Sequence, residues 1–209
     1  MKRNQHIKTF IGSFILIGFL SSCSNTKTEE KESASQIVAP KEEDIHIIEV
    51  QADVDTLKGS LKAKAMGTIG SAGITINYYS PAVRGRVIWG GLVPFDHVWV
   101  TGAHRATSID FNQEAVIGGV TISPGKYGLF TIPGKEEWII IINKNWDQHL
   151  ADDYDQKQDI VRVAVKPEME EVNQERLRYV IESGSSNTGE VVIYWEKLEV
   201  SLPITTPSN

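Results

Sequence analysis

The sequence of 209 residues contains a single cysteine, Cys23. One cysteine excludes a disulfide within the chain, so the fold cannot depend on covalent cross-links. Long hydrophobic segments are also missing, because the uncharged apolar run near the N-terminus, from Phe10 to Leu20, has only 11 residues. A helix needs about 20 apolar residues to cross a membrane. These absences exclude a disulfide-rich scaffold and argue against a membrane-spanning helix.

Motifs that mark common enzyme classes are absent as well. The sequence has no Gly-x-Ser-x-Gly elbow, no Gly-x-x-x-x-Gly-Lys-[Ser/Thr] phosphate loop and no His-Glu-x-x-His metal motif. His97 and His104 lie seven positions apart, which matches none of the short ligand spacings of zinc sites. The aspartates between Asp147 and Asp155 fail the calcium-loop pattern, because Lys157 stands where a further ligand is needed. We therefore expect no metal and no cofactor, and we disfavour an enzymatic role.

The charge balance of the chain is acidic. Aspartate and glutamate number 27 against 21 lysines and arginines, which gives a formal net charge of −6. Removal of residues 1–22 would leave 18 basic residues against 27 acidic ones. A negative surface repels phosphate backbones, and the sequence has no basic patch with interleaved aromatic residues. We therefore expect no nucleic-acid partner.

The N-terminus has the features of an export signal. Three basic residues within the first eight positions precede the apolar run, which ends in Leu20-Ser21-Ser22-Cys23. These four residues resemble the bacterial lipobox, in which the cysteine receives a diacylglycerol thioether and fatty acyl chains such as palmitate. We predict a signal peptide over residues 1–22 and lipid attachment at Cys23. The expected partner is a membrane of the cell envelope, with the protein at the outer membrane or the periplasmic face rather than in the cytoplasm.

Composition divides the remaining chain into a tether and one domain. Residues 24–40 are almost entirely polar, and such a segment cannot bury enough apolar surface to offset the entropy lost on ordering. We predict a flexible acidic tether over residues 23–59, an all-β domain over residues 60–205 and a tail over residues 206–209. The predicted domain has the ordinary size of a single folding unit.

Short segments rich in Val, Ile, Thr and Tyr alternate with Gly and Pro, a pattern typical of antiparallel strands joined by tight turns. Apolar and polar residues alternate over 107–111, 176–182 and 198–204, as half-buried strands require. Residues 138–142 are apolar at every position, which predicts a central strand covered on both faces. The fold class that follows is all-β, as an antiparallel β-sandwich or a flattened barrel.

Turn residues predict where the strands are joined. Gly118-Gly119, Pro124-Gly125 and Pro133-Gly134 each separate two apolar segments, so we predict a hairpin at each of them. The polar segment 147–158 is the one long interruption of the strand pattern. We expect it to form a helical turn or to cross the edge of the sandwich.

Three segments in the first half of the domain carry long, specific motifs. They are Tyr78–Arg86 (YYSPAVRGR), Ile88–Phe95 (IWGGLVPF) and Val98–Ala103 (VWVTGA). Together with residues 125–134 and 195–196 they resemble the domain-of-unknown-function family 2911, and the resemblance spans the predicted domain. Membership implies an exported, often lipid-anchored domain without an established reaction or ligand. Many members resemble Trp-Arg-Thr-Gly-Ala-Asn-Glu-Ala-Thr, whereas this chain has Val100 and His104-Arg105 at the positions of Arg and Asn-Glu.

The residues best suited to bind a ligand are concentrated between positions 84 and 105. Guanidinium groups suit carboxylates or phosphates, and aromatic faces suit sugar rings, so a small anionic molecule or a glycan is the expected ligand. The alternative is structural, since the arginines can bond loop carbonyls and the tryptophans can belong to the core. The candidate ligand-binding residues are Arg84, Arg86, Trp89, His97, Trp99, Thr101, His104 and Arg105.

Three functional hypotheses stay open at this point. The first is an envelope-anchored lipoprotein whose β-sandwich is a binding or accessory module. The second is a hydrolase-like enzyme that uses the Arg, His and Asp residues between positions 84 and 105. The third is a purely structural module. A concave site lined by the candidate residues would favour binding or catalysis, whereas their dispersal or burial would favour the structural role.

Overall fold

The computed structural model describes residues 55–207, so Cys23, the predicted signal peptide and most of the predicted tether lie outside the described residues. The described part consists of ten β-strands and one short 3-10 helix, η1 (Gln156–Gln158), without an α-helix. The predicted all-β fold class is confirmed. Within this part of the chain no helix has the length and apolar character that crossing a membrane requires.

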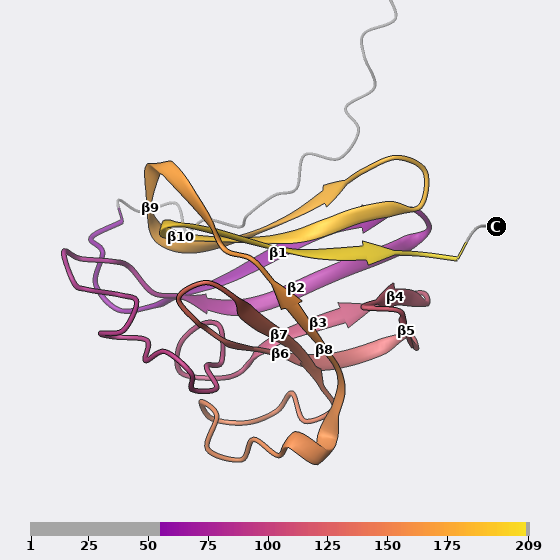
Figure 1. Cartoon of the computed structure of the whole chain (residues 1–209), viewed down its shortest axis with the longest axis horizontal. Helices are drawn as coiled ribbons and strands as arrows, with labels where there is room; N and C mark the ends of the chain where they lie inside the picture. Colours follow the sequence, from indigo (N-terminus) through magenta and orange to yellow (C-terminus); the bar gives the residue numbers. More distant parts are fainter. Residues whose placement is uncertain (1–54, 208–209) are drawn as a thin grey trace, which may run out of the picture. The chain divides into compact units, whose positions relative to one another are not determined.

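The strands form two antiparallel sheets that pack face to face and are not joined into a closed barrel (Figure 1). The six-stranded sheet has the order β1 (Leu61–Ile69), β2 (Ala72–Ser80), β3 (Thr107–Phe111), β6 (Gly125–Ile132), β7 (Trp138–Asn143) and β8 (Asp159–Val165). The four-stranded sheet has the order β5 (Val120–Ile122), β4 (Ala115–Ile117), β10 (Thr188–Thr205) and β9 (Glu168–Ser183). The fold is therefore a β-sandwich, one of the two architectures that the sequence predicts.

The core lies between the two sheets and is built from alternate residues of their strands. In β9 the side chains of Leu177, Tyr179 and Ile181 are buried, whereas Arg178 and Glu182 are exposed. The last part of β10 alternates in the same way, as does β2. Because successive side chains of a strand point to opposite faces, one face of each strand meets the core. The strands predicted from alternation at 107–111, 176–182 and 198–204 are confirmed.

The predicted central strand is also confirmed. β7 lies between β6 and β8, and its side chains alternate between two apolar clusters. Ile140 and Ile142 face the main core, whereas Ile141 contacts a second, smaller cluster on the outer face of the six-stranded sheet. An apolar residue at every position is thus explained by burial on both faces.

The hairpins predicted from turn residues are confirmed at two of three places. Gly118 and Gly119 join β4 to β5 with positive φ angles of 56° and 79°, a conformation that glycine adopts without steric cost. The turn at Pro133-Gly134 joins β6 to β7. The hairpin predicted at Pro124-Gly125 is wrong, because β5 and β6 belong to different sheets. A turn signal marks a change of direction, whereas the pairing of strands depends on which apolar faces are buried together.

The outer face of the six-stranded sheet is only partly covered. Two segments, 98–106 and 144–158, lie over β6 and β7, where Val100 and Ala106 pack against Phe130 and Ile141. We call them the covering loops. Beyond them the outer face of β1, β2 and β3 carries polar residues such as Asn77. A hollow lined by basic and aromatic side chains lies at the boundary between the covered and the open half.

Candidate functional site

The two candidate tryptophans belong to the core rather than to an open site. Trp89 makes edge-to-face contacts with Trp99, Trp138 and Trp195, with ring centroids 4.8 to 5.9 Å apart. Trp99 stacks on Trp195 at a centroid distance of 5.6 Å and an interplanar angle of 18°. Such contacts stabilise aromatic clusters beyond the burial of area alone. Four of the five tryptophans of the chain thus form one cluster, and the fifth, Trp146, lies elsewhere.

Thr101 is fully buried and holds two elements together. Its hydroxyl lies 3.1 Å from Thr131 Oγ1 and 3.2 Å from the carbonyl oxygen of Trp99, and either oxygen can accept its hydrogen bond. Its carbonyl oxygen accepts bonds from the hydroxyls of Tyr179 at 2.7 Å and Thr107 at 3.0 Å. Burial raises the pKa of the Tyr179 hydroxyl well above its usual value, so it remains a hydrogen-bond donor. The geometry gives Thr101 a positioning role inside the sandwich.

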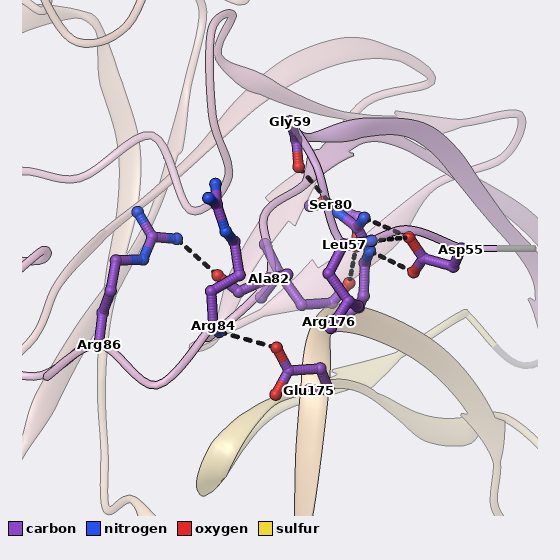
Figure 2. A network of polar contacts seen from close by, with 10 residues as sticks. Asp55, Leu57, Gly59, Ser80, Ala82, Arg84, Arg86, Glu175 and Arg176 are labelled. Carbon is purple, nitrogen blue, oxygen red and sulfur yellow. Dashed lines mark hydrogen bonds and ion pairs between the residues drawn. The ribbon is translucent and has the colours of Figure 1, made fainter.

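Arg84 and Arg86 lie in the loop after β2 and contact the chain around them (Figure 2). The Arg86 guanidinium donates to the carbonyl oxygens of Ala82 at 2.5 Å and Val83 at 3.1 Å. Arg84 has a positive φ of 53°, and its backbone N–H donates to Glu175 Oε1 at 2.7 Å. The Arg86 contacts match the structural alternative, in which an arginine satisfies loop carbonyls.

The two candidate histidines lie in different places. His97 is exposed, and its Nδ1 lies 2.7 Å from the carbonyl oxygen of Phe95, two residues before it. His104 packs edge-to-face against the ring of Tyr79, with centroids 5.1 Å apart. Tyr79 lines the hollow beside the covering loops, so His104 supports one wall of that hollow.

Arg105 is the candidate residue that faces the hollow directly. Its guanidinium forms an ion pair with the Asp147 carboxylate, which connects the two covering loops. The backbone adds two hydrogen bonds between the loops, from the Leu150 N–H to the His104 carbonyl oxygen at 2.9 Å and from the Ala106 N–H to the Gln148 carbonyl oxygen at 3.1 Å. Both members of the ion pair are more than half exposed, so the Arg105 charge remains open to solvent and to a ligand.

The hollow is a groove of about 240 Å³ on the outer face of the six-stranded sheet. We call it the outer-face groove. Its floor comes from β1, β2, β3 and β6, and its walls come from the covering loops and from the Tyr79 ring near the end of β2. The residues whose chemistry matters here are Lys62, Asn77, Tyr79, Arg105, Ser108, Lys126, Trp146 and Asp147.

Positive charge and aromatic surface meet in the outer-face groove. Three cationic side chains line it, those of Lys62, Arg105 and Lys126, against one carboxylate, that of Asp147. The Lys126 ammonium lies 3.8 Å from the centroid of the Trp146 ring, a cation–π contact that holds the indole over the groove. Within residues 55–207 neither lysine of the groove forms an ion pair.

The floor of the groove offers polar groups without internal partners. Asn77 and Ser108 are register partners on β2 and β3, so their side chains lie next to each other on the outer face. Within the described part of the chain neither side chain forms a hydrogen bond. Natural proteins rarely leave amide and hydroxyl groups of a concave surface unused, because water or a ligand bonds them.

The second covering loop is held by a polar network behind the groove. The Asn143 amide donates to the Asp159 carboxylate at 2.7 Å and to the Asp155 carbonyl oxygen at 3.1 Å. The Tyr154 hydroxyl donates to Asp159 Oδ2 at 2.7 Å, and Arg162 donates to both groups. Burial, together with the Asp159 carboxylate, raises the pKa of Tyr154 to about 12. This network fixes the loop that carries Trp146 and Asp147.

The predicted polar interruption at 147–158 therefore forms a covering loop that ends in the 3-10 helix η1. Its aspartates have separate partners, since Asp152 lies 3.0 Å from His149 and Asp155 accepts the Lys157 N–H at 2.9 Å. Among the residues that the structure describes, no group of three or more His, Cys, Asp or Glu side chains is arranged to hold a metal ion.

A second, smaller hollow of about 170 Å³ lies on the outer face of β9 and β10. It differs from the groove because its lining has two carboxylates, those of Glu170 and Glu196, against one cation, that of Arg178. Burial, with the Glu170 carboxylate beside it, raises the pKa of the nearby Glu199. An acidic surface of this kind repels anions and lacks the arrangement that would hold a cation.

The sequence does not indicate that most of the groove residues belong to a binding site. Lys62, Asn77, Ser108 and Lys126 occupy the polar positions of alternating strands, where a solvent-facing role is the default expectation. Trp146 is the exception, because an exposed tryptophan in a polar loop is unusual for a soluble surface. That single residue could have pointed to the groove.

These observations define a two-sheet β-sandwich domain with a basic, aromatic groove on an outer face. The chain belongs to the family of proteins of unknown function DUF2911, whose model matches residues 60–204. No curated protein and no solved structure matches the chain.

Proposed function

We propose that this protein is a lipid-anchored binding module of the cell envelope, with the outer-face groove as its ligand site. Cys23 would carry the lipid, and the sandwich domain would present the groove to small molecules in the surrounding aqueous space. The observation that carries the binding proposal is the convergence of Lys62, Arg105 and Trp146 on a floor of unpaired polar side chains.

The groove supports binding more strongly than hydrolysis. Glycosidases need two carboxylates about 5 to 9.5 Å apart, whereas Asp147 is the one carboxylate in the groove lining and is paired with Arg105. Of the residues in the hydrolase hypothesis, Arg86 bonds loop carbonyls and His97 bonds Phe95. A purely structural module is disfavoured, because such a module has no need for two lysines without an ionic partner in a concave site.

Lipid anchoring is supported by the lipobox-like sequence before Cys23 and by the absence of another cysteine. The test is mass spectrometry of the protein from the membrane fraction of its native host. We expect an N-terminal peptide that begins at an acylated Cys23, and a Cys23→Ser variant that leaves the membrane fraction. A full-length unmodified chain in the cytosol would contradict the proposal.

Ligand binding is tested by a thermal-shift screen of residues 24–209 against neutral and charged sugars, carboxylates, phosphates and amines. A compound that binds the native state raises the melting temperature, because it stabilises the folded form by RT ln(1 + L/Kd), where L is the free ligand concentration. We expect at least one class to stabilise the domain and to lose its effect in Trp146→Ala. Stabilisation that survives in Trp146→Ala, or none with any class, would overturn the groove as the binding site. Met169→Ala is the matched control, since Met169 is exposed on β9 away from the groove.

A further inference from the structure

We propose that the outer-face groove recognises an acidic saccharide, a single sugar ring that bears a carboxylate. This inference rests on the proposed binding function and names the ligand class of the same site. Four properties of the groove carry it: its charge, its aromatic walls, its polar floor and its size.

The charge of the groove is opposite to that of the domain around it. Residues 55–209 carry 15 lysines and arginines against 19 aspartates and glutamates, a net charge of −4. The groove nevertheless has three cations and one carboxylate in its lining. Because a concave surface concentrates the field of its charges, anions are attracted here and repelled from most of the remaining surface. The ammonium groups of Lys62 and Lys126, which have no ionic partner in residues 55–207, would attract a carboxylate into the groove.

The aromatic walls favour a ring over a simple anion. Trp146 remains 37% exposed although it is a large apolar side chain, and Lys126 holds its indole in place. Tyr79 forms another wall, with its ring fixed by the edge contact of His104. The C–H faces of sugar rings pack on aromatic surfaces of this kind, because both are apolar while their edges stay hydrated.

The floor favours a ligand that carries hydroxyl groups. The Asn77 amide can donate two hydrogen bonds and accept others at its oxygen. The Ser108 hydroxyl can donate one hydrogen bond and accept others. The two residues are cross-strand neighbours, so they present their groups side by side. Sugar hydroxyls can donate and accept at the same time, which satisfies both side chains, whereas an aliphatic carboxylate can only accept.

The size of the groove limits the ligand to about one ring. Its volume of about 240 Å³ is smaller than the range of about 300 to 1,000 Å³ that is usual for drug-sized ligands. A nucleotide, with a base, a ribose and phosphates, exceeds this space. A single uronic acid fits the volume, the charge and the hydroxyl pattern together.

The test compares ligands that differ in one property each, by calorimetry or by ligand-detected NMR on the intact domain. The probes are D-glucuronate, the neutral sugar D-glucose, and the ring-free anions acetate and inorganic phosphate. We expect D-glucuronate to bind about tenfold or more tightly than either D-glucose or the simple anions, since a charged hydrogen bond and a ring contact each contribute measurably. Equal binding of D-glucose would overturn the acidic class, and equal binding of acetate or phosphate would overturn the saccharide class.

Substitutions of groove residues test whether D-glucuronate binds in the groove. The Lys62→Gln/Lys126→Gln double variant should weaken D-glucuronate about tenfold and remove most of its salt dependence, because screening acts on exposed charges. Asn77→Ala should weaken both D-glucuronate and any residual D-glucose binding. The matched controls are Lys166→Gln and Asn173→Ala, whose side chains are exposed outside the groove and should leave binding unchanged.

The outcomes separate this inference from the proposed function. If a different compound class binds and depends on Trp146, the groove remains a binding site and the acidic-saccharide inference fails. If no class binds through Trp146, both fail. If D-glucuronate binds and the groove variants bind it as well as the wild type, the saccharide lies elsewhere and the inference is overturned.

Discussion

The Arg176 guanidinium on β9 donates two hydrogen bonds to the Asp55 carboxylate, from Nε to Oδ2 at 2.6 Å and from Nη2 to Oδ1 at 2.5 Å (Figure 2). The same guanidinium donates through Nη1 to the carbonyl oxygens of Gly59 at 2.9 Å and Ser80 at 2.8 Å. One arginine thus connects the segment before β1, the end of β2 and β9. The hydrogen bonds from Arg176 lower the pKa of Asp55 to about 2. The described chain is therefore tied to the sandwich from its first residue.

This pair predicts a stability change at low pH. The folded-state pKa of Asp55 lies below its ordinary value of 3.8, so the contribution of the pair is present above about pH 4 and is lost as the pH falls toward 2. At pH 7 Asp55→Asn should lower the melting temperature by about 2 to 4 °C, the effect of about 1 kcal/mol in a domain of this size. Melting curves of the variant and the wild type should converge near pH 2. Asp153→Asn, at an exposed position, is the control, and a difference that persists unchanged at pH 2 would contradict the ion pair.

The raised pKa of Glu199 predicts a dependence of stability on pH with the opposite sign. Its folded-state pKa is raised, first by burial and then by Glu170, so its favourable contribution is present below its ordinary pKa and is lost as the pH rises through the raised value. Glu199→Gln should therefore raise the melting temperature at pH 7 and change it little at pH 4. Glu171→Gln, at an exposed position of β9, serves as the comparison. Destabilisation of Glu199→Gln at pH 7 would show that the carboxylate is needed there.

The fold was largely predictable because strand periodicity is a local property. The alternation of Leu177, Tyr179 and Ile181 with polar residues reports directly which face of β9 is buried. Which sheet a strand joins is not local. The turn at Pro124-Gly125 has the same residue types as the true hairpin turns, yet it connects β5 of one sheet to β6 of the other. The strands that pair with β6 are β3 and β7.

The candidate site was less predictable, for a related reason. Residues that are close in the sequence between positions 84 and 105 point to separate surroundings: Trp89 to the core, Arg86 to loop carbonyls and Arg105 to the groove. The groove itself draws side chains from strands and loops as distant as Lys62 and Asp147. No short motif can encode such a set, because only the sheet pairing brings its members together.

The tryptophans predict two different responses to truncation. Trp195 is buried in the four-membered cluster, so Trp195→Ala should cost about 3 to 5 kcal/mol of unfolding free energy. Trp146→Ala removes an exposed ring and one cation–π contact, which should cost less than about 1 kcal/mol. Denaturant titrations measure both values. Comparable losses would contradict the division between core and groove tryptophans.

Arg86 and Arg105 form a matched pair of variants. Arg86→Ala should lower stability by about 1 to 2 kcal/mol, because the guanidinium bonds to the carbonyl oxygens of Ala82 and Val83 are lost, and should leave ligand binding intact. Arg105→Ala should barely change stability, since its ion pair is exposed, and should weaken ligand binding in the groove. Denaturant titrations and binding measurements on both variants show which arginine stabilises the fold and which one binds the ligand. The reverse pattern would move the binding site to the loop after β2.

A two-dimensional NMR titration of the isotope-labelled domain with D-glucuronate shows directly whether the ligand binds in the outer-face groove. We expect chemical-shift changes confined to the groove, at the side-chain amide of Asn77, the backbone amide of Ser108 and the indole N–H of Trp146. The indole signals of Trp89 and Trp195 should stay in place, because both rings belong to the core cluster. Shifts centred on residues 84–97 with an unmoved Trp146 signal would contradict binding in the groove.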